Sequence, residues 1–319
     1  MFIGHSYEKI LKGDYMSFNS MKPLYLKTGV EEIEQRYEKA LLAWKKCNLC
    51  PHNCQVDRLN GVKGKCQADS NANIASYGPH FGEERPLVGS KGSGTIFFTY
   101  CNLSCVFCQN WSISRGKERG DPVSDRELAQ TMLYLQKIGC HNINLVTPTP
   151  HIPPILKALS VAVKQGLEIP LVYNSGGYES SETIKLLEGI IDIYMPDCKY
   201  GDSETAFKYS GAKDYPYFML ESLKEMQQQV GDLKLNEKGI AYRGLMVRHL
   251  VLPNKLANTE EVVNMLSKEV SPNCAVNIMD QYYPANHAHY HQPLNRRITR
   301  NEFHNALKLA REAGLRVIN

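Results

Sequence analysis

The chain contains 319 residues, of which 43% are hydrophobic and 22% are charged, a composition typical of globular proteins. Its net charge of +4, from 37 basic and 33 acidic residues, is too small to indicate by itself a nucleic-acid-binding or membrane-surface protein. No apolar run approaches the roughly 18 residues needed to span a bilayer. The start of the chain also lacks the features of a secretory signal. We therefore expect a cytoplasmic protein that does not enter the membrane.

The first 90 residues do not alternate strand and helix patterns as the rest of the chain does. Apolar residues recur there at helical spacing, which predicts one amphipathic helix that packs on the rest of the protein. The apolar positions are Val30, Ile33, Tyr37, Ala40, Leu41 and Trp44. We interpret residues 1–90 as a small cysteine-rich extension that precedes a larger domain over residues 91–319.

Four cysteines follow this helix at the spacing C-x2-C-x3-C-x11-C. They are Cys47, Cys50, Cys54 and Cys66. In a reducing compartment, grouped cysteines indicate metal ligands rather than disulfides. Four thiolates could hold a zinc ion, as a closed structural site, or an iron–sulfur cluster, as an auxiliary redox or substrate-binding centre. Gly61 and Gly64 would let the backbone fold tightly around either centre, and His52 is a further candidate ligand.

From about residue 95 the chain alternates short apolar runs with helical patterns, which indicates parallel strands joined by helices. The predicted strands are Thr95–Tyr100, Ile143–Thr147, Pro170–Asn174, Ile191–Met195, Leu245–Leu252 and Ala275–Met279. Six such strands need not close an eight-stranded barrel. The predicted fold class is therefore α/β, with an open, partial (β/α)6 barrel of parallel strands. Functional groups in such folds gather at the carboxyl ends of the strands.

Helix starts are marked by two capping boxes, in which Ser or Thr is followed three residues later by Glu. The pairs are Ser124 with Glu127 and Thr299 with Glu302. Thr259 is expected to open another helix, which would continue to residue 270. The connection over residues 203–238 has the length for two helices.

Three further cysteines follow the first predicted strand at the spacing C-x3-C-x2-C: Cys101, Cys105 and Cys108. Three thiolates can hold three irons of a [4Fe–4S] cube and leave the fourth iron without a protein ligand, whereas four cysteines are normally supplied. Such an open position is typical of catalytic metal sites. The alternative is three buried thiols in the core, because free cysteine is often buried. The polar residues around them, such as Asn102 and Gln109, argue against that alternative.

Charged residues also occur at the ends of predicted strands. Asp197 and Lys199 end the fourth apolar run, and Arg248 lies inside the fifth, where a buried guanidinium is costly unless it is paired. We therefore expect Arg248 to have a functional partner. Alternation along the strand end points Cys198 away from Asp197 and Lys199, toward the helices. We predict that Cys198, Cys140 and Cys274 belong to the core.

Residues 47–319 resemble the radical S-adenosylmethionine (SAM) superfamily, within it the group called PflX-like that is related to pyruvate formate-lyase activating enzyme. The segments that carry the resemblance, in chain order, are CNLCPHNC, HFGEERPLVGSKGSGTIFFTYCNLSCVFCQNWSIS, LVTPTPHIP, LVYNSGGYE, DIYMPDCKY, LMVRHLVLPN and LNRRIT. The resemblance implies a partial barrel and an open iron of the cluster that is chelated by SAM. It implies that Cys101, Cys105 and Cys108 are the cluster ligands and that Phe107 lies near the adenine.

The resemblance also implies a SAM site made of residues after successive strands. Where the family usually has a Gly-Gly-Glu segment, this chain has Thr-Pro-Thr-Pro, so the hydroxyls of Thr147 and Thr149 would replace its contact to the SAM amine. The remaining positions implied are Asn174 and Ser175 for the ribose or carboxylate, Asp197 for the SAM amine or a substrate backbone, Lys199 for an anion, and Arg248 for SAM.

The function implied is reductive cleavage of SAM to methionine and a 5′-deoxyadenosyl radical, which abstracts hydrogen from a substrate. The electron would come from a reductant such as flavodoxin or ferredoxin. The related activases suggest a glycyl radical enzyme as substrate, and another protein, a peptide or a small molecule is the alternative. A second class is a non-catalytic iron–sulfur or zinc protein that binds a partner or relays electrons. Nucleic acid is not expected as a partner, because the lysines beside the first cysteine group form only a small basic rim.

Overall fold

The computed structural model describes residues 22–115, 118 and 120–318. Its central feature is a curved sheet in which six parallel strands lie side by side in chain order. The six strands are β2 (Ser93–Phe98), β4 (Ile143–Val146), β5 (Leu171–Ser175), β6 (Ile193–Pro196), β8 (Ala241–Leu250) and β9 (Ala275–Met279). The predicted (β/α)6 partial barrel is therefore confirmed, with strand boundaries that shift by one to four residues.

Short strands extend the sheet at both edges. At one edge β1 (Ala72–His80) pairs antiparallel with β2, and β3 (Asp121–Val123) pairs antiparallel with β1. At the other edge β10 (Arg316–Val317) pairs parallel with β9, and β7 (Lys234–Leu235) pairs antiparallel with the start of β8. Because β1 lies within residues 1–90, the sheet crosses the boundary that we expected between the two regions.

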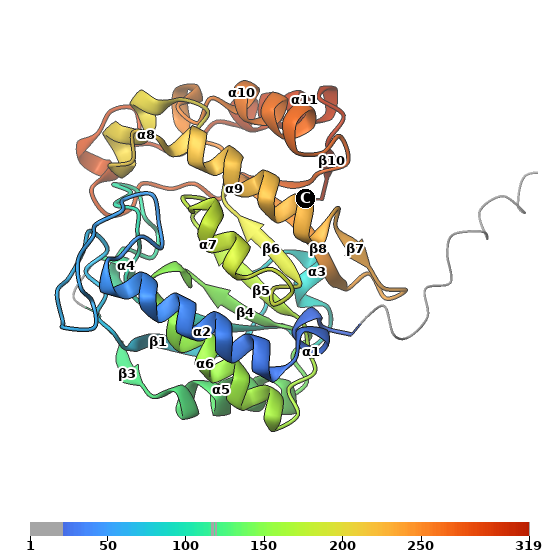
Figure 1. The fold of residues 1–319 in the computed structure, drawn as a ribbon. Coiled ribbons are helices and arrows are strands. Elements are labelled where there is room, and N and C mark those ends of the chain that lie inside the picture. The colour runs from blue at the N-terminus through green and yellow to red at the C-terminus, as the bar shows by residue number, and fades with distance from the viewer. Residues whose placement is uncertain (1–21, 116–117, 119, 319) are drawn as a thin grey trace, which may run out of the picture.

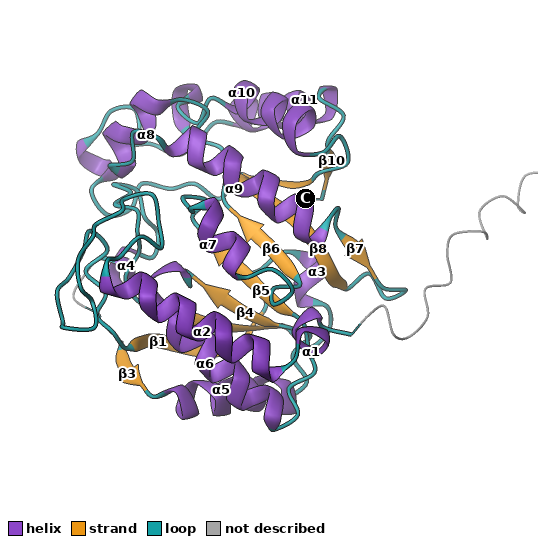
Figure 2. Ribbon diagram, viewed as in Figure 1, coloured by secondary structure: helices purple, strands orange, loops and turns teal. Residues whose placement is uncertain are grey.

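Helices cover the outer face of the sheet and leave its inner face, which we call the barrel lumen, to the functional side chains. Figure 2 shows one layer of helices in front of the strands. The helices are α1 (Leu24–Thr28), α2 (Val30–Lys45), α3 (Arg85–Val88), α4 (Trp111–Ser114), α5 (Asp125–Lys137), α6 (Ile152–Lys164), α7 (Ser181–Leu186), α8 (Ser203–Ser210), α9 (Tyr215–Val230), α10 (Thr259–Met265) and α11 (Arg300–Glu312). The predicted N-terminal helix is thus present as α2, and it packs on α6.

Local signals account for several of these helices. Both capping boxes form as predicted, at the starts of α5 and α11. The connection over residues 203–238 contains two helices, α8 and α9. Thr259 opens α10 as predicted, and a π-helical turn over Leu266–Val270 continues it to residue 270. The Thr259 hydroxyl lies 2.9 Å from Nε2 of His249.

The core has two parts. The larger one lies between the sheet and the helices, and a smaller apolar cluster fills the lower part of the lumen. The smaller cluster consists of Leu87, Val172, Ile193, Met195, Leu233, Ala241, Met246 and Ala275. Cys140, Cys198 and Cys274 are buried, as predicted. The apolar cluster fills the amino-terminal part of the lumen.

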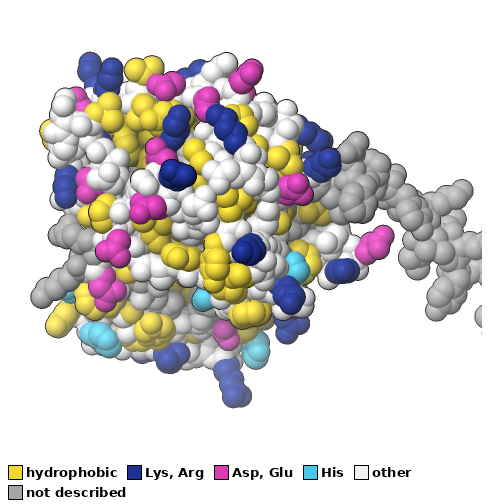
Figure 3. All heavy atoms as spheres, turned by 90° about the horizontal axis from the view of Figure 1, so that it is seen from below, with side chains coloured by type: hydrophobic (Ala, Val, Ile, Leu, Met, Phe, Trp, Pro, Cys, Tyr) yellow, Lys and Arg dark blue, Asp and Glu magenta, His cyan; other side chains and the backbone are white. Residues whose placement is uncertain are grey.

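No single type of side chain dominates the face of the molecule seen in Figure 3. Lysine and arginine side chains alternate there with acidic and apolar ones, and neither charge forms a continuous patch on that face. Among the helices of the described residues, none has the length and apolar character required to cross a membrane.

Candidate functional site

The cysteine loops lie together at the carboxyl edge of the parallel strands. In Figure 1 they form the blue and cyan loops at the left, beyond the tips of β4 and β5. The loop with Cys101, Cys105 and Cys108 begins directly after β2, and Tyr100 turns the chain out of the strand with a φ of 67°. Backbone hydrogen bonds from Ser104 and Val106 to the end of α8 hold this loop in place. The position is the one that the sequence predicted.

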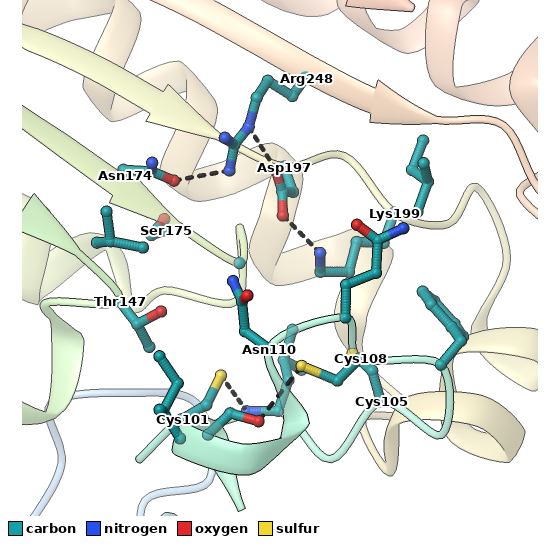
Figure 4. Close-up of a pocket in the computed structure, with 18 of the residues that line it drawn as sticks. Cys101, Cys105, Cys108, Asn110, Thr147, Asn174, Ser175, Asp197, Lys199 and Arg248 are labelled. Atoms are coloured by element: carbon teal, nitrogen blue, oxygen red, sulfur yellow. Dashed lines mark hydrogen bonds and ion pairs between the residues drawn. The ribbon is translucent and has the colours of Figure 1, made fainter. Parts of the chain in front are cut away.

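The thiols of Cys101, Cys105 and Cys108 line one cavity and receive hydrogen bonds from nearby groups (Figure 4). Ser210 Oγ donates to Cys105 Sγ over 2.9 Å, and the Leu103 amide donates to Cys101 Sγ over 3.4 Å. Ser114 Oγ lies 3.3 Å from Cys108 Sγ. Donors directed at sulfur stabilise thiolates and tune the reduction potential of iron–sulfur clusters.

Burial keeps the thiols of Cys101 and Cys105 uncharged as long as no metal binds them. Burial raises the pKa of Cys101 to about 12, and burial also raises the pKa of Cys105. Alone, the thiols would stay protonated, whereas a bound metal deprotonates a thiol that coordinates it. Within the described part of the chain, no three His, Cys, Asp or Glu side chains converge on the position of one metal ion. A [4Fe–4S] cluster has no need of such convergence, because each thiolate binds a separate iron.

A chain of charged groups faces the thiols across the cavity (Figure 4). Asp197 lies at the end of β6 and joins two cations: its Oδ2 is 2.5 Å from Lys199 Nζ, and its Oδ1 is 2.8 Å from Arg248 Nε. Arg248 Nη2 donates in turn to Asn174 Oδ1, on β5, over 2.6 Å. Arg248 therefore has the partner that its place in a buried strand requires.

The pairing determines the charge of each group. Burial would raise the pKa of Asp197, but Arg248 and Lys199 together hold it below its usual value. Burial would lower the pKa of Lys199, but Asp197 and Cys105 raise it above its usual value. The carboxylate is thus ionised and the ammonium charged, and Lys199 places a positive charge close to Cys105.

Most of the residues predicted for SAM lie on the wall of this cavity. They are Phe107, Thr147, Asn174, Ser175, Asp197, Lys199 and Arg248, together with the three cysteines. Thr149 does not lie on this wall. Its hydroxyl donates to Glu179 Oε1 over 3.0 Å and accepts from Tyr173 over 3.1 Å. The structure brings Thr147, but not Thr149, to the cysteines.

Three functional candidates were missed in the sequence. Glu179 is fully buried, and burial raises its pKa to about 8. Glu83 lies with its Oε2 3.7 Å from Arg248 Nη1 and is the third contact of that guanidinium. Ser210 donates to Cys105. Glu83 and Glu179 fall within the segments HFGEERPLVGS and LVYNSGGYE that carry the resemblance. Nothing in the local pattern, however, connects either glutamate to its partner.

The N-terminal cysteines form a compact loop of their own. Burial raises the pKa of Cys50, and Cys66, Glu179 and Cys47 raise it further. Cys54 Sγ accepts a hydrogen bond over 3.2 Å from the amide of Lys65, the residue before Cys66. A Cβ on Gly64 would lie 3.0 Å from Cys54 Sγ, which explains the need for glycine at this position.

The two cysteine loops are in direct contact. Nε2 of His52 lies 2.7 Å from the carbonyl oxygen of Asn102, which follows Cys101. Asn102 donates to the carbonyl of Tyr178 over 2.6 Å, and the rings of Tyr178 and His52 meet edge to face. Arg115 donates both to Leu103 and to Lys65, one residue in each loop. Any centre in the first loop would therefore be rigidly positioned relative to the second.

Several known proteins are similar to this chain in sequence. The sequence model of the radical SAM superfamily matches residues 95–236. The uncharacterized protein MJ0674 of Methanocaldococcus jannaschii is 34% identical over 98% of this chain and 88% of its own length. The uncharacterized protein MJ0808 of the same organism is 24% identical over 48% of this chain and 52% of its own length.

Among solved structures, HydG, a maturase of the [FeFe]-hydrogenase, matches 67% of this chain and 47% of its own length. The TM-score is 0.44 and the identity 13%. The family match therefore assigns residues 95–236 to the radical SAM superfamily, whose enzymes use a [4Fe–4S] cluster and SAM.

Proposed function

We propose that this protein binds a [4Fe–4S] cluster through Cys101, Cys105 and Cys108 and cleaves SAM reductively there. The observation that carries the proposal is a single cavity lined both by three thiols and by the charged chain of Asp197, Lys199 and Arg248. When bound, the cluster supplies one electron that breaks a carbon–sulfur bond of SAM, yielding methionine and the 5′-deoxyadenosyl radical that abstracts hydrogen from substrate.

The residues of the cavity would bind and orient SAM. The amino group of SAM suits the Asp197 carboxylate, and its carboxylate suits the cations Lys199 and Arg248. Because these three side chains already hold one another, the charges are fixed before SAM binds. Thr147 and Ser175 offer hydroxyls, and Asn174 an amide, for the polar edge of the ribose. Phe107, buried beside the thiols, offers an apolar ring to the adenine.

Two substrate classes follow from this chemistry. The sequence resemblance to the activases favours a glycine residue of a glycyl radical enzyme. The polar lumen next to the cysteines favours a small molecule or a peptide with charged groups, because Glu83, Glu84 and Arg248 reach into it. Hydrogen transfer from a candidate glycyl radical protein to the 5′-deoxyadenosyl radical would support the activase. SAM cleavage without such transfer would favour the second class.

We also propose a second metal centre at Cys47, Cys50, Cys54 and Cys66, either zinc or an iron–sulfur cluster. The spacing of the four cysteines and the contact of His52 with the other loop support it. Because no three His, Cys, Asp or Glu side chains of the described residues converge on one ion position, a cluster, whose thiolates bind separate irons, fits this arrangement better than zinc. Iron and zinc analysis of the anaerobically purified protein, compared between wild type and Cys66→Ser, would identify the metal. Loss of zinc in the variant would indicate a structural site, and loss of part of the iron an auxiliary cluster.

The experiment that tests the main proposal is a SAM cleavage assay with dithionite as electron donor, in the place of a flavodoxin or ferredoxin. Wild type should form 5′-deoxyadenosine, and Cys105→Ala should not, because one iron loses its ligand. Cys140→Ala is the matched control, since this thiol is buried in the core away from the cavity. Equal cleavage by Cys105→Ala and wild type would refute the assignment of the cluster ligands.

A further inference from the structure

A second cavity continues the cysteine cavity into the lumen. The two share Asn174 and Arg248, and the second has a volume of about 280 Å3. Its distinctive side chains are two glutamates, Glu83 and Glu84, from the segment between β1 and α3. Because His80 at the end of β1 pairs with Ser93 at the start of β2, this segment enters the lumen from the amino edge of the strands. Phe97 on β2 also lines the cavity, as do Asn110 and Gln281, which belong to the wall of the cysteine cavity as well.

Glu84 lines this cavity, and one of its carboxylate oxygens has no hydrogen-bond partner. Its side chain is buried, with the residue only 8% exposed. Oε1 accepts a hydrogen bond from Asn277 Nδ2 over 3.0 Å, whereas the buried Oε2 has no partner. A buried carboxylate oxygen without a donor costs free energy, unless a ligand supplies the donor. Both amide atoms of buried Asn144 also lack partners, and Asn144 shares the lumen face of β4 with Val146.

The positively charged side chains near this cavity do not neutralise all of its carboxylates. Arg248 already donates to Asp197 and Asn174, and only its third nitrogen approaches Glu83, at 3.7 Å. Oε1 of Glu83 lies 3.0 Å from Nδ1 of His80. Three carboxylates, of Asp197, Glu83 and Glu84, thus face the two permanent cations Lys199 and Arg248. Burial raises the pKa of Glu83 above its usual value, Arg248 opposes this shift, and the nearby Glu84 adds to it.

We propose that Glu84, with Glu83 beside it, binds a positively charged nitrogen of the substrate, either an ammonium or a guanidinium group. The inference rests on the proposed function, because it names the substrate class that would occupy the lumen next to SAM. An organic cation supplies N–H donors to the free oxygen of Glu84, and its charge completes the balance. A metal ion is a poorer occupant, because no three potential ligands converge on one point in the residues that the structure describes.

The test measures binding of matched probes by titration calorimetry. Anaerobic holoenzyme with SAM bound and no reductant is titrated with n-butylammonium against n-butanol, and with n-butylguanidinium against N-butylurea. At least one cation should bind with a Kd tenfold or more below that of its neutral partner. Glu84→Gln should reduce this preference at least fivefold, whereas Glu84→Asp should retain most of it. Glu237→Gln, at an exposed position, should behave as wild type.

Several results would overturn the inference. One is equal binding of the cations and their neutral partners. Another is a preference for cations that is unchanged in Glu84→Gln. A third is weaker SAM binding by this variant with no change in its preference for cationic probes, which would assign Glu84 to SAM. Displacement of the probes by Mn²⁺ in a Glu84-dependent manner would assign the site to a metal. If Glu84→Gln does not fold, Glu83→Gln should lower the cation preference instead. SAM cleavage, measured separately, tests the proposed function: its absence would overturn that function even if cations bind.

Discussion

Arg248 Nε donates a 2.8 Å hydrogen bond to Asp197 Oδ1 across the neighbouring strands β8 and β6, on the lumen side of the sheet. The pair connects the two parts of the site. On one side Asp197 holds Lys199 toward the cysteines, and on the other Arg248 faces Glu83. Each of these charged side chains is paired with the next one. A single substitution should therefore affect both the stability of the protein and its cleavage of SAM.

Asp197→Asn tests this dependence. The substitution leaves the buried cations Lys199 and Arg248 without their shared carboxylate, so the free energy of unfolding should fall by about 3 to 5 kcal/mol. Denaturant unfolding under anaerobic conditions measures the change. Asp202→Asn is a suitable control, because Asp202 only caps α8 through a 2.8 Å hydrogen bond from Thr205, and Asn caps helices equally well. A similar small effect in both variants would show that Asp197 does not hold the charged row together.

Ser210→Ala tests the hydrogen bond to the proposed cluster ligand Cys105. A donor to sulfur favours the reduced, more negative cluster, so its loss should lower the reduction potential. A redox titration followed by EPR measures the shift. The control is Ser222→Ala, because buried Ser222 donates only to Met219 within α9. An unchanged potential in Ser210→Ala would indicate that Cys105 does not bind the cluster in this conformation.

The two threonines after β4 should differ in their effects. Thr147→Ala removes a hydroxyl from the cavity wall and should weaken SAM binding about two- to tenfold, the equivalent of one hydrogen bond. Thr149→Ala should leave SAM binding unchanged but lower the free energy of unfolding by about 1 to 3 kcal/mol, because buried Glu179 loses a donor. Equilibrium binding of SAM and denaturant unfolding distinguish the two. The opposite pattern would place Thr149, and not Thr147, in the SAM site.

Stability in mild acid should depend on His249. The ring is fully buried between the Cys198 carbonyl at 2.6 Å and the Thr259 hydroxyl at 2.9 Å, contacts that a neutral ring satisfies. Burial lowers its pKa to about 4. The unfolded chain binds a proton near pH 6.5 and the folded one only near pH 4, so the free energy of unfolding decreases as pH falls between these values, by up to about 3 kcal/mol.

His249→Gln lacks this titration and provides the comparison. Unfolding of both proteins between pH 7 and pH 4 should show the stability of wild type declining relative to the variant. A constant difference over this range would mean that His249 binds its proton at the same pH in the folded and the unfolded protein.

The fold was largely predictable because its parallel strands are short, continuous apolar runs. Ala275–Met279 was predicted with its observed boundaries. β1 was not predicted, since only its first three residues are buried and the rest of the strand reads as a polar loop. β8 begins four residues earlier than predicted, because its first residues pair with β7 rather than with the apolar core.

The site was predictable only in part, for a different reason. Cys101, Cys105 and Cys108 form a local motif, and Asp197 and Lys199 are two residues apart, so spacing reveals them. Glu83 meets Arg248 only after the segment beyond β1 enters the lumen, across 165 residues of chain. Thr149 and Glu179 are also distant in sequence. Such pairings depend on the arrangement of the strands, which local pattern does not specify.

The most direct test of the account is the low-temperature EPR spectrum of anaerobically purified, dithionite-reduced protein, recorded with and without SAM. We predict a reduced [4Fe–4S] signal that changes when SAM is added, because SAM would bind the iron that Cys101, Cys105 and Cys108 leave open. The change should be absent in Cys105→Ala. A cluster signal in wild type that is indifferent to SAM would contradict the proposed site and would favour an electron-relay or scaffold role.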